Sequence, residues 1–164
     1  MNKSENIKAY LASHPIDKKY ILVGDAITDK ELNIAKVRLS ANERPLLLVK
    51  SSNWFTATFN ALWGVKLSGF VISDKAMHWA NLMPDSFFAT LAPWFGRKTG
   101  MAALEDIKSV TLGRSDVCFG NAYEGHQLII NGSVVGLVRI GSGITFSDEV
   151  VDWLKALFNT CINE

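Results

Sequence analysis

Apolar residues follow a helical spacing in the first part of the chain. Ile7, Tyr10 and Leu11 lie at helical intervals, and Pro15 ends the segment that they predict as a helix. A short apolar run, Tyr20–Val23, follows it. The pattern therefore predicts one helix and then a separate apolar segment.

A second helix is predicted to begin at Thr28. Thr28 and Glu31 form a capping box, in which the Thr28 hydroxyl accepts from the Glu31 amide and the Glu31 carboxylate reaches back. The helical pattern runs to about Leu39. Residues 1–42 are therefore expected to form a helical N-terminal arm.

After Pro45 the pattern changes from helical to extended. Leu46–Val49 reads as a compact apolar strand, and residues 65–79 read as two strands joined by a polar turn at Ser73–Lys75. Further extended segments are predicted at Met101–Leu104 and Ser109–Leu112. Short strands linked by turns indicate an antiparallel sheet.

Asn131 and Gly132 mark the clearest hairpin in the chain. They join the apolar segments Gln127–Ile130 and Ser133–Ile140. Asn-Gly supplies the two positive-φ residues of a type I′ turn, whose twist matches that of the flanking strands. The sequence therefore predicts two adjacent antiparallel strands here.

The chain closes with a predicted amphipathic helix. Thr145 and Ser147 are candidate N-caps, and the acidic Asp148 and Glu149 suit the positive end of the helix dipole. The apolar face of this helix contains Val150, Leu154, Leu157, Phe158 and Cys161. Such a face needs an apolar surface to cover, and the open end or face of the sheet is the expected one.

This order of elements resembles that of pleckstrin-homology-like (PH-like) domains. The segment Ser68–Trp79 resembles the "dGfllTdkgiyy" hairpin of a bacterial PH-like family of unknown function, and Leu104–Ile107 resembles the "l.dI" step that follows it. Asp25–Leu32 looks like the helical lead-in that some members carry. The resemblance covers roughly residues 45–161 and implies a binding or self-assembly module without catalysis.

The predicted fold class is α+β. We expect an N-terminal arm over residues 1–42 and a PH-like antiparallel β-barrel or sandwich, capped by the C-terminal helix, over residues 43–164. The chain departs from the family pattern at residues 87–100, where an apolar insert replaces a short link.

Composition narrows the function without naming it. Hydrophobic residues make up 48% and charged residues 20% of the 164 residues, which is an ordinary globular mixture. The net charge of +1 gives no electrostatic case for nucleic acid. The first residues are too polar for a signal peptide, and no apolar run reaches the ~20 residues of a membrane helix. We therefore expect a soluble cytoplasmic protein.

The residue types that usually carry chemistry are scattered. His14, His78 and His126 lack metal-site spacing, which favours structural or solvent-facing roles. Cys118 and Cys161 lie in apolar runs without a CxxC motif, which favours buried thiols. No nucleophile or phosphate-loop motif occurs. We expect no enzyme activity, cofactor or metal.

Phosphoinositide binding has little support in the sequence. A site of that kind needs several basic residues around the first hairpin, because each phosphate oxygen requires a charged donor. The chain has no basic residue between Lys50 and Lys66.

The insert is the most informative departure from the family pattern. The predicted interaction surface consists of Phe87, Phe88, Leu91, Trp94, Phe95, Arg97 and Lys98. The insert can fold over the sheet and complete the core, or dock against another subunit or protein. It can also contact a membrane surface, with Trp94 at the interface and Arg97 and Lys98 on head groups.

The leading hypothesis is a non-enzymatic cytoplasmic interaction module that binds a protein partner or itself through this insert. We expect Trp94 and Phe95 to carry the contact, because large aromatic side chains dominate interface energies. The first alternative is a carrier of a small apolar ligand, in which the sheet and the C-terminal helix enclose a cavity. The second alternative, a peripheral membrane-surface binder, is less favoured.

Overall fold

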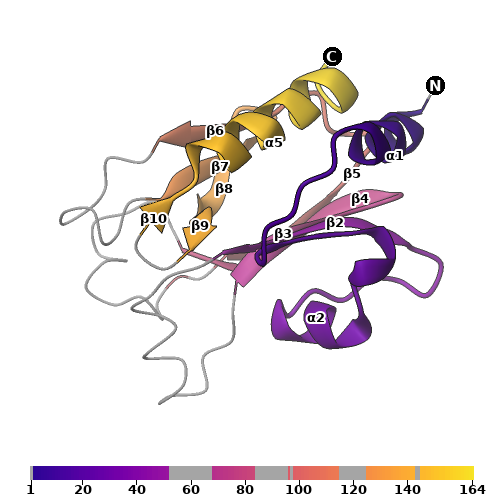
Figure 1. The fold of residues 1–164 in the computed structure, drawn as a ribbon, viewed down its shortest axis with the longest axis horizontal. Coiled ribbons are helices and arrows are strands. Elements are labelled where there is room, and N and C mark those ends of the chain that lie inside the picture. The colour runs from indigo at the N-terminus through magenta and orange to yellow at the C-terminus, as the bar shows by residue number, and fades with distance from the viewer. Residues whose placement is uncertain (1, 52–67, 84–95, 97, 115–124, 143–144) are drawn as a thin grey trace.

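The computed structural model describes residues 2–51, 68–83, 96, 98–114, 125–142 and 145–164 (Figure 1). In chain order the elements are α1 (Lys3–Ser13), β1 (Ile21–Val23), the 3-10 helix η1 (Gly24–Ala26), α2 (Asp29–Ile34), β2 (Pro45–Ser51), β3 (Ser68–Ser73), β4 (Ala76–Leu82), β5 (Lys98–Ala103), β6 (Val110–Arg114), β7 (His126–Ile130), β8 (Ser133–Val138), β9 (Gly141–Ser142), β10 (Thr145–Phe146) and α5 (Asp148–Cys161). The protein is α+β, with two main antiparallel sheets and a C-terminal helix.

Five strands form the larger sheet in the order β1-β2-β3-β4-β5, and every neighbouring pair is antiparallel. The predicted β3–β4 hairpin is confirmed. At its turn, Ser73 Oγ accepts hydrogen bonds from the amides of Lys75 and Ala76 at 3.2 and 2.9 Å. This is the local bonding that favours a serine at a turn.

Three strands form the second sheet in the order β6-β7-β8. Their second hairpin turns at Asn131 (φ 50°) and Gly132 (φ 78°), which confirms the predicted pair of left-handed residues. Asn131 Oδ1 also accepts hydrogen bonds from the amides of Lys108 and Ser109, at 2.7 and 3.1 Å. The turn therefore also fixes the segment that leads into β6.

The two sheets do not close into a barrel, which corrects that part of the predicted fold class. β5 and β6 follow one another in the chain but belong to different sheets, and residues 104–109 connect them. In the described part, the sheets are linked by an isolated bridge between Met83 and Leu137. A hydrogen bond from the Arg139 amide to Ser51 Oγ, at 2.8 Å, adds a second link.

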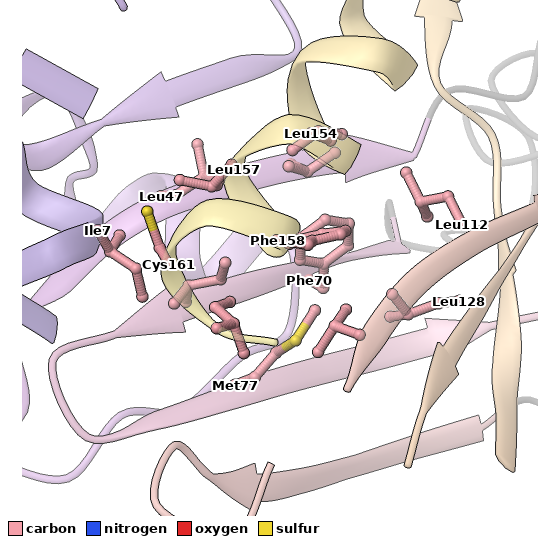
Figure 2. Packing of buried hydrophobic residues seen from close by; sticks show 14 of the residues in the cluster. Ile7, Leu47, Phe70, Met77, Leu112, Leu128, Leu154, Leu157, Phe158 and Cys161 are labelled. Carbon is pink, nitrogen blue, oxygen red and sulfur yellow. The ribbon is translucent and has the colours of Figure 1, made fainter. Parts of the chain in front are cut away.

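Helix α5 packs on both sheets, as its apolar stripe predicts. All five predicted stripe residues are buried. Figure 2 shows Phe158 of α5 against Phe70 of β3, and their ring centroids lie 6.3 Å apart. Burying one such side chain stabilises the fold by about 1.5–3 kcal/mol. Neither α5 nor any other described helix is long and apolar enough to span a bilayer.

Helix α1 lies beside α5 (Figure 1). The rings of Tyr10 and Trp153 are 5.9 Å apart, and Trp153 Nε1 donates to the carbonyl of His14 at 3.1 Å. Ile7 belongs to the same core as the α5 stripe. The first helix therefore helps to cover the face of the large sheet that α5 covers, which we call the inner face.

The opposite face of the large sheet, which we call the outer face, is covered by α2 and the residues around it (Figure 1). This second apolar cluster contains Ile27, Leu32, Ala35, Val37, Leu48, Val71 and Ala80. The large sheet is thus buried on both sides over most of its width.

Helix α2 is shorter than the sequence predicts, because it ends at Ile34 and not near Leu39. Lys36 takes the left-handed conformation (φ 54°), and the Val37 amide then donates to the carbonyl of Leu32 at 3.1 Å. These are features of a helix C-terminus. The turn places Val37 in the outer apolar cluster, which continuing the helix would not allow.

The predicted capping box is half formed. Thr28 Oγ1 accepts from the Glu31 amide at 3.4 Å, as expected. The Glu31 carboxylate does not reach back, because it pairs with Lys50 Nζ of β2 at 2.6 Å. A tertiary ion pair has replaced a local hydrogen bond, and it ties α2 to the sheet.

Candidate functional site

The predicted interaction surface lies almost wholly outside the described residues, and it stays a prediction. The residues concerned are Phe87, Phe88, Leu91, Trp94, Phe95 and Arg97. The seventh, Lys98, is the exposed first residue of β5. The end of the insert is therefore corrected, because Lys98–Gly100 belong to a strand and not to the insert.

Strand β5 forms one edge of the large sheet, since it pairs only with β4 in the described part. No charged residue occurs from Thr99 to Leu104. Met101, in the middle of the strand, is 60% exposed, and it is the only exposed large hydrophobic side chain among the described residues. Sheets usually protect such edges with charges, prolines, bulges or a covering segment. We call the free side of Lys98–Ala103 the β5 edge.

The β5 edge presents backbone groups as well as side chains. The Leu104 amide donates to the carbonyl of Lys75, which lies opposite it, at 2.8 Å. Lys75 and Leu104 are therefore a hydrogen-bonded pair. Hydrogen-bonded and non-hydrogen-bonded residue pairs alternate along antiparallel strands, and His78 and Met101 lie three positions further along, so they are a non-hydrogen-bonded pair. The N–H and C=O of Met101 therefore point away from β4, and those of Ala103 do so as well.

Two surface grooves meet at Met101. One, of about 320 Å³, lies between β5 and the segment after α2, and its exposed cations are Lys36 and Arg38. The other, of about 600 Å³, lies toward the Ala103 end of β5. Its ionisable residues are Lys3, Glu43, Asp74, Lys75, Glu105 and Glu164. We call them the basic groove and the acidic groove, because the second has four carboxylates against two ammonium groups.

A buried polar cluster lies beside these grooves. The Glu43 carboxylate contacts His78 Nε2 at 2.7 Å and accepts a hydrogen bond from Ser73 Oγ at 2.8 Å. The Glu43 and His78 side chains are only 6% and 9% exposed. Burial by itself raises the pKa of Glu43, but hydrogen bonds from His78, Ser73 and Ser40 outweigh it, so this pKa lies below its ordinary value.

The order of groups in this cluster does not suit nucleophilic catalysis. In a catalytic triad the imidazole lies between hydroxyl and carboxylate, whereas here the carboxylate lies between the other two. Ser73 is also fully buried. Nearby, Arg44 and Asp74 exchange two hydrogen bonds of 2.9 Å, one of them to the Asp74 side chain. The cluster therefore clamps the segment before β2 to the β3–β4 hairpin.

A third groove, of about 520 Å³, lies between the second sheet and the start of α5. Its ionisable residues are Arg114, His126, Asp148, Asp152 and Lys155. Both signs of charge occur in this lining. Across the described ranges, no group of three or more His, Cys, Asp or Glu residues is arranged to hold a metal ion.

The prediction that both cysteines are buried can be checked for one of them. Cys161 is a buried thiol on α5, as the sequence predicts, and burial raises the pKa of this thiol. Cys118 lies outside the described residues, so its burial stays a prediction.

The sequence indicates the insert but not the edge beside it. The uncharged run from Thr99 to Leu104 was the only local signal, and it does not tell a central strand from an edge strand. Lys36 and Arg38 lie far earlier in the chain, and the end of α2 brings them beside β5. An edge is a property of strand order, which local patterns do not contain.

No family model, no curated protein and no solved structure matches this chain. The function must therefore be argued from the geometry of its own residues.

Proposed function

We propose that this chain is a non-enzymatic interaction module that associates with copies of itself through the segment between β4 and β5. One observation carries the proposal. The aromatic insert lies between Met83 and Lys98 in the sequence, so it is followed directly by the strand that forms the β5 edge. Met101, the exposed apolar residue of that edge, comes only three residues after Lys98. Adjacent apolar groups of this kind are typical of an interface.

The scaffold proposed for this module is PH-like. In its support, the four consecutive strands β2–β5 form an antiparallel meander, three more strands form a second one, and α5 follows. This is the order that the sequence resemblance implies. Helix α1, strand β1 and helix α2 precede that unit. Binding without catalysis is the role that the resemblance implies for it.

The carrier alternative receives no support from the described residues. A sheet gripped by a helix would hold its ligand between α5 and the large sheet. That space is filled by side chains, including the rings of Phe70 and Phe158 with centroids 6.3 Å apart (Figure 2). The grooves described above open at the surface and have charged linings, which an apolar ligand does not favour.

A membrane-surface role fits the edge less well than a protein contact does. Lys98 and the insert's Arg97 would face anionic head groups. The acidic groove, however, places Asp74, Glu105 and Glu164 on the same rim as Met101. Anionic lipid would repel these carboxylates, whereas a protein surface can present cations to them.

Light scattering of the full chain across a range of concentrations tests the proposal. We expect a mass of two or more chains that falls toward one chain on dilution. The double variant Trp94→Asp, Phe95→Asp should have the mass of one chain, because two carboxylates would have to be buried in the contact. A parent chain that has the mass of one chain at every concentration refutes the proposal.

A matched control adds the same two charges elsewhere. Ala9 on α1 and Ala156 on α5 are exposed, so Ala9→Asp, Ala156→Asp should leave the mass of the parent unchanged. Native mass spectrometry of the protein as purified separates the carrier alternative. A retained small apolar ligand on a one-chain species would favour the carrier.

A further inference from the structure

We infer that two copies of this chain pair antiparallel along their β5 edges, about a two-fold axis at Met101, so that the large sheet continues from one copy into the other. The inference rests on the proposed self-association and gives it a geometry and a partner surface. Addition of a strand to an exposed sheet edge is a common mode of recognition. A two-fold axis makes the same surface serve both copies.

The backbone of β5 suits this pairing. The N–H and C=O groups of Met101 face the free side, so each Met101 can exchange two hydrogen bonds with its counterpart. In that register Thr99 lies opposite Ala103 of the partner copy. The side chains of Thr99, Met101 and Ala103 lie on the same face of β5, and none of them is charged. The pairing therefore brings no like charges into direct opposition.

Charge along the edge favours the antiparallel direction. The basic groove, with Lys36 and Arg38, borders the Thr99 half of β5. The acidic groove, with Asp74 and Glu105, borders the Ala103 half. A two-fold axis at Met101 places the basic groove of each copy beside the acidic groove of the other, so the dimer contains two such contacts. Parallel pairing would instead place grooves of like charge together.

The opposite edge of the same sheet is better protected. Strand β1 has only three residues, Ile21–Val23, and Lys18 and Lys19 precede it closely. Short strands and lysines are common ways to prevent pairing at an edge. Strand β5 has six residues, with a charge only at Lys98. Self-association is therefore expected at β5 and not at β1.

The first test removes one hydrogen-bond donor from the free side. Met101→Pro deletes an N–H that β4 does not use, and proline is tolerated at edge strands in that orientation. Its matched control is Met101→Val, which keeps the N–H and favours a strand. By sedimentation velocity we expect the proline variant to dimerise at least about tenfold more weakly than the valine control. Thermal unfolding of both variants verifies that each is folded.

The second test reverses charges without altering the strand. Arg38→Glu and Glu105→Arg each place like charges across the two-fold axis, so each variant alone should dimerise about tenfold more weakly than the parent. An equimolar mixture should recover parental dimerisation. In the mixture, one copy carries negative charge at both substituted positions and the other carries positive charge at both, so each contact again joins opposite charges. A variant that cannot fold would not recover in the mixture.

The outcomes separate this inference from the proposed function. If the parent self-associates but neither the proline variant nor the charge mixture behaves as stated, β5 pairing is wrong and self-association through the insert stands. If the parent has the mass of one chain throughout, both fail. If dimerisation recovers in the mixture and is weakened in Met101→Pro, two copies pair along β5. Both results would be unexpected if β5 instead bound another peptide or were covered by a segment of its own chain.

Discussion

The two faces of the five-stranded sheet are covered in different ways. The inner face carries large apolar side chains such as Phe70 and Met77, beneath α5 and against the second sheet (Figure 2). The outer face carries smaller ones such as Val71 and Ala80, together with the paired His78, beneath a six-residue helix and the segment after it. One face builds the main core, and the other has a thinner cover.

The difference explains why the β5 edge is exposed. His78 on β4 and Met101 on β5 are opposite one another across the outer face. His78 is 7% exposed, whereas Met101 is 60% exposed. The outer cover therefore ends between two neighbouring strands. After α2 ends at Ile34 the chain turns at Lys36, and the segment that follows borders β5 along a groove without burying Met101.

The largest expected effect comes from truncating one residue on each face. Phe158→Ala should lower the free energy of unfolding by about 4 kcal/mol, because it leaves a cavity at the centre of the inner core. Leu32→Ala on the outer face should cost about 2 kcal/mol, because its site is nearer to solvent and can relax. Urea unfolding measures both. Equal losses would mean that the two covers contribute alike.

Breaking the Glu43–His78 pair should have the next largest effect. His78→Ala removes the imidazole and leaves the Glu43 carboxylate buried with fewer partners, at a cost of about 2 kcal/mol. The matched control is His14→Ala, since His14 is exposed at the end of α1 and should cost less than about 1 kcal/mol. Urea unfolding of the two variants decides. Similarly small losses of unfolding free energy in both variants would show that the Glu43–His78 pair adds little to the stability of the outer cover.

The buried Glu43 carboxylate should also make the free energy of unfolding depend on pH in the acidic range. The pKa of Glu43 is lower in the folded chain, so between its folded and ordinary values the unfolded chain binds more protons. Its contribution is therefore complete above about pH 5 and is lost as pH falls through the folded pKa. Glu43→Gln cannot ionise. The difference in unfolding free energy between parent and variant should shrink from pH 7 to pH 3, and a constant difference would contradict this assignment.

Local patterns were sufficient for most of the secondary structure. The Asn131–Gly132 turn and the α5 stripe depend on residues close in sequence, and both are confirmed. Strand order is different. The pairing of β1 with β2 and the separation of the strands into two sheets depend on contacts between distant segments. The prediction of a barrel was wrong because hairpins alone do not determine whether a sheet closes.

The candidate site was harder to predict than the fold. Glu43 and His78 are 35 residues apart, and neither has a neighbour in sequence that indicates the pair. Met101 appears in the sequence as one residue of an apolar run. Its exposure follows only from the position of β5 in the sheet and from the early end of α2 at Ile34. The interaction surface predicted on the insert remains a prediction, because its residues other than Lys98 lie outside the described ranges.

The smallest expected effect would show whether the two covers open independently. Thr28→Ala removes the cap of α2, whose hydrogen bond is long at 3.4 Å, so the loss should be about 0.5 kcal/mol. Amide hydrogen exchange in α2 should become about two- to threefold faster, while amides of α5 such as those of Leu157 and Phe158 keep their rates. Asn2→Ala, which removes the α1 cap, is the matched control and should accelerate α1 instead. If the α5 amides accelerate as much as those of α2, the outer cover and the inner core unfold as one unit, and the two faces of the sheet do not differ in local stability.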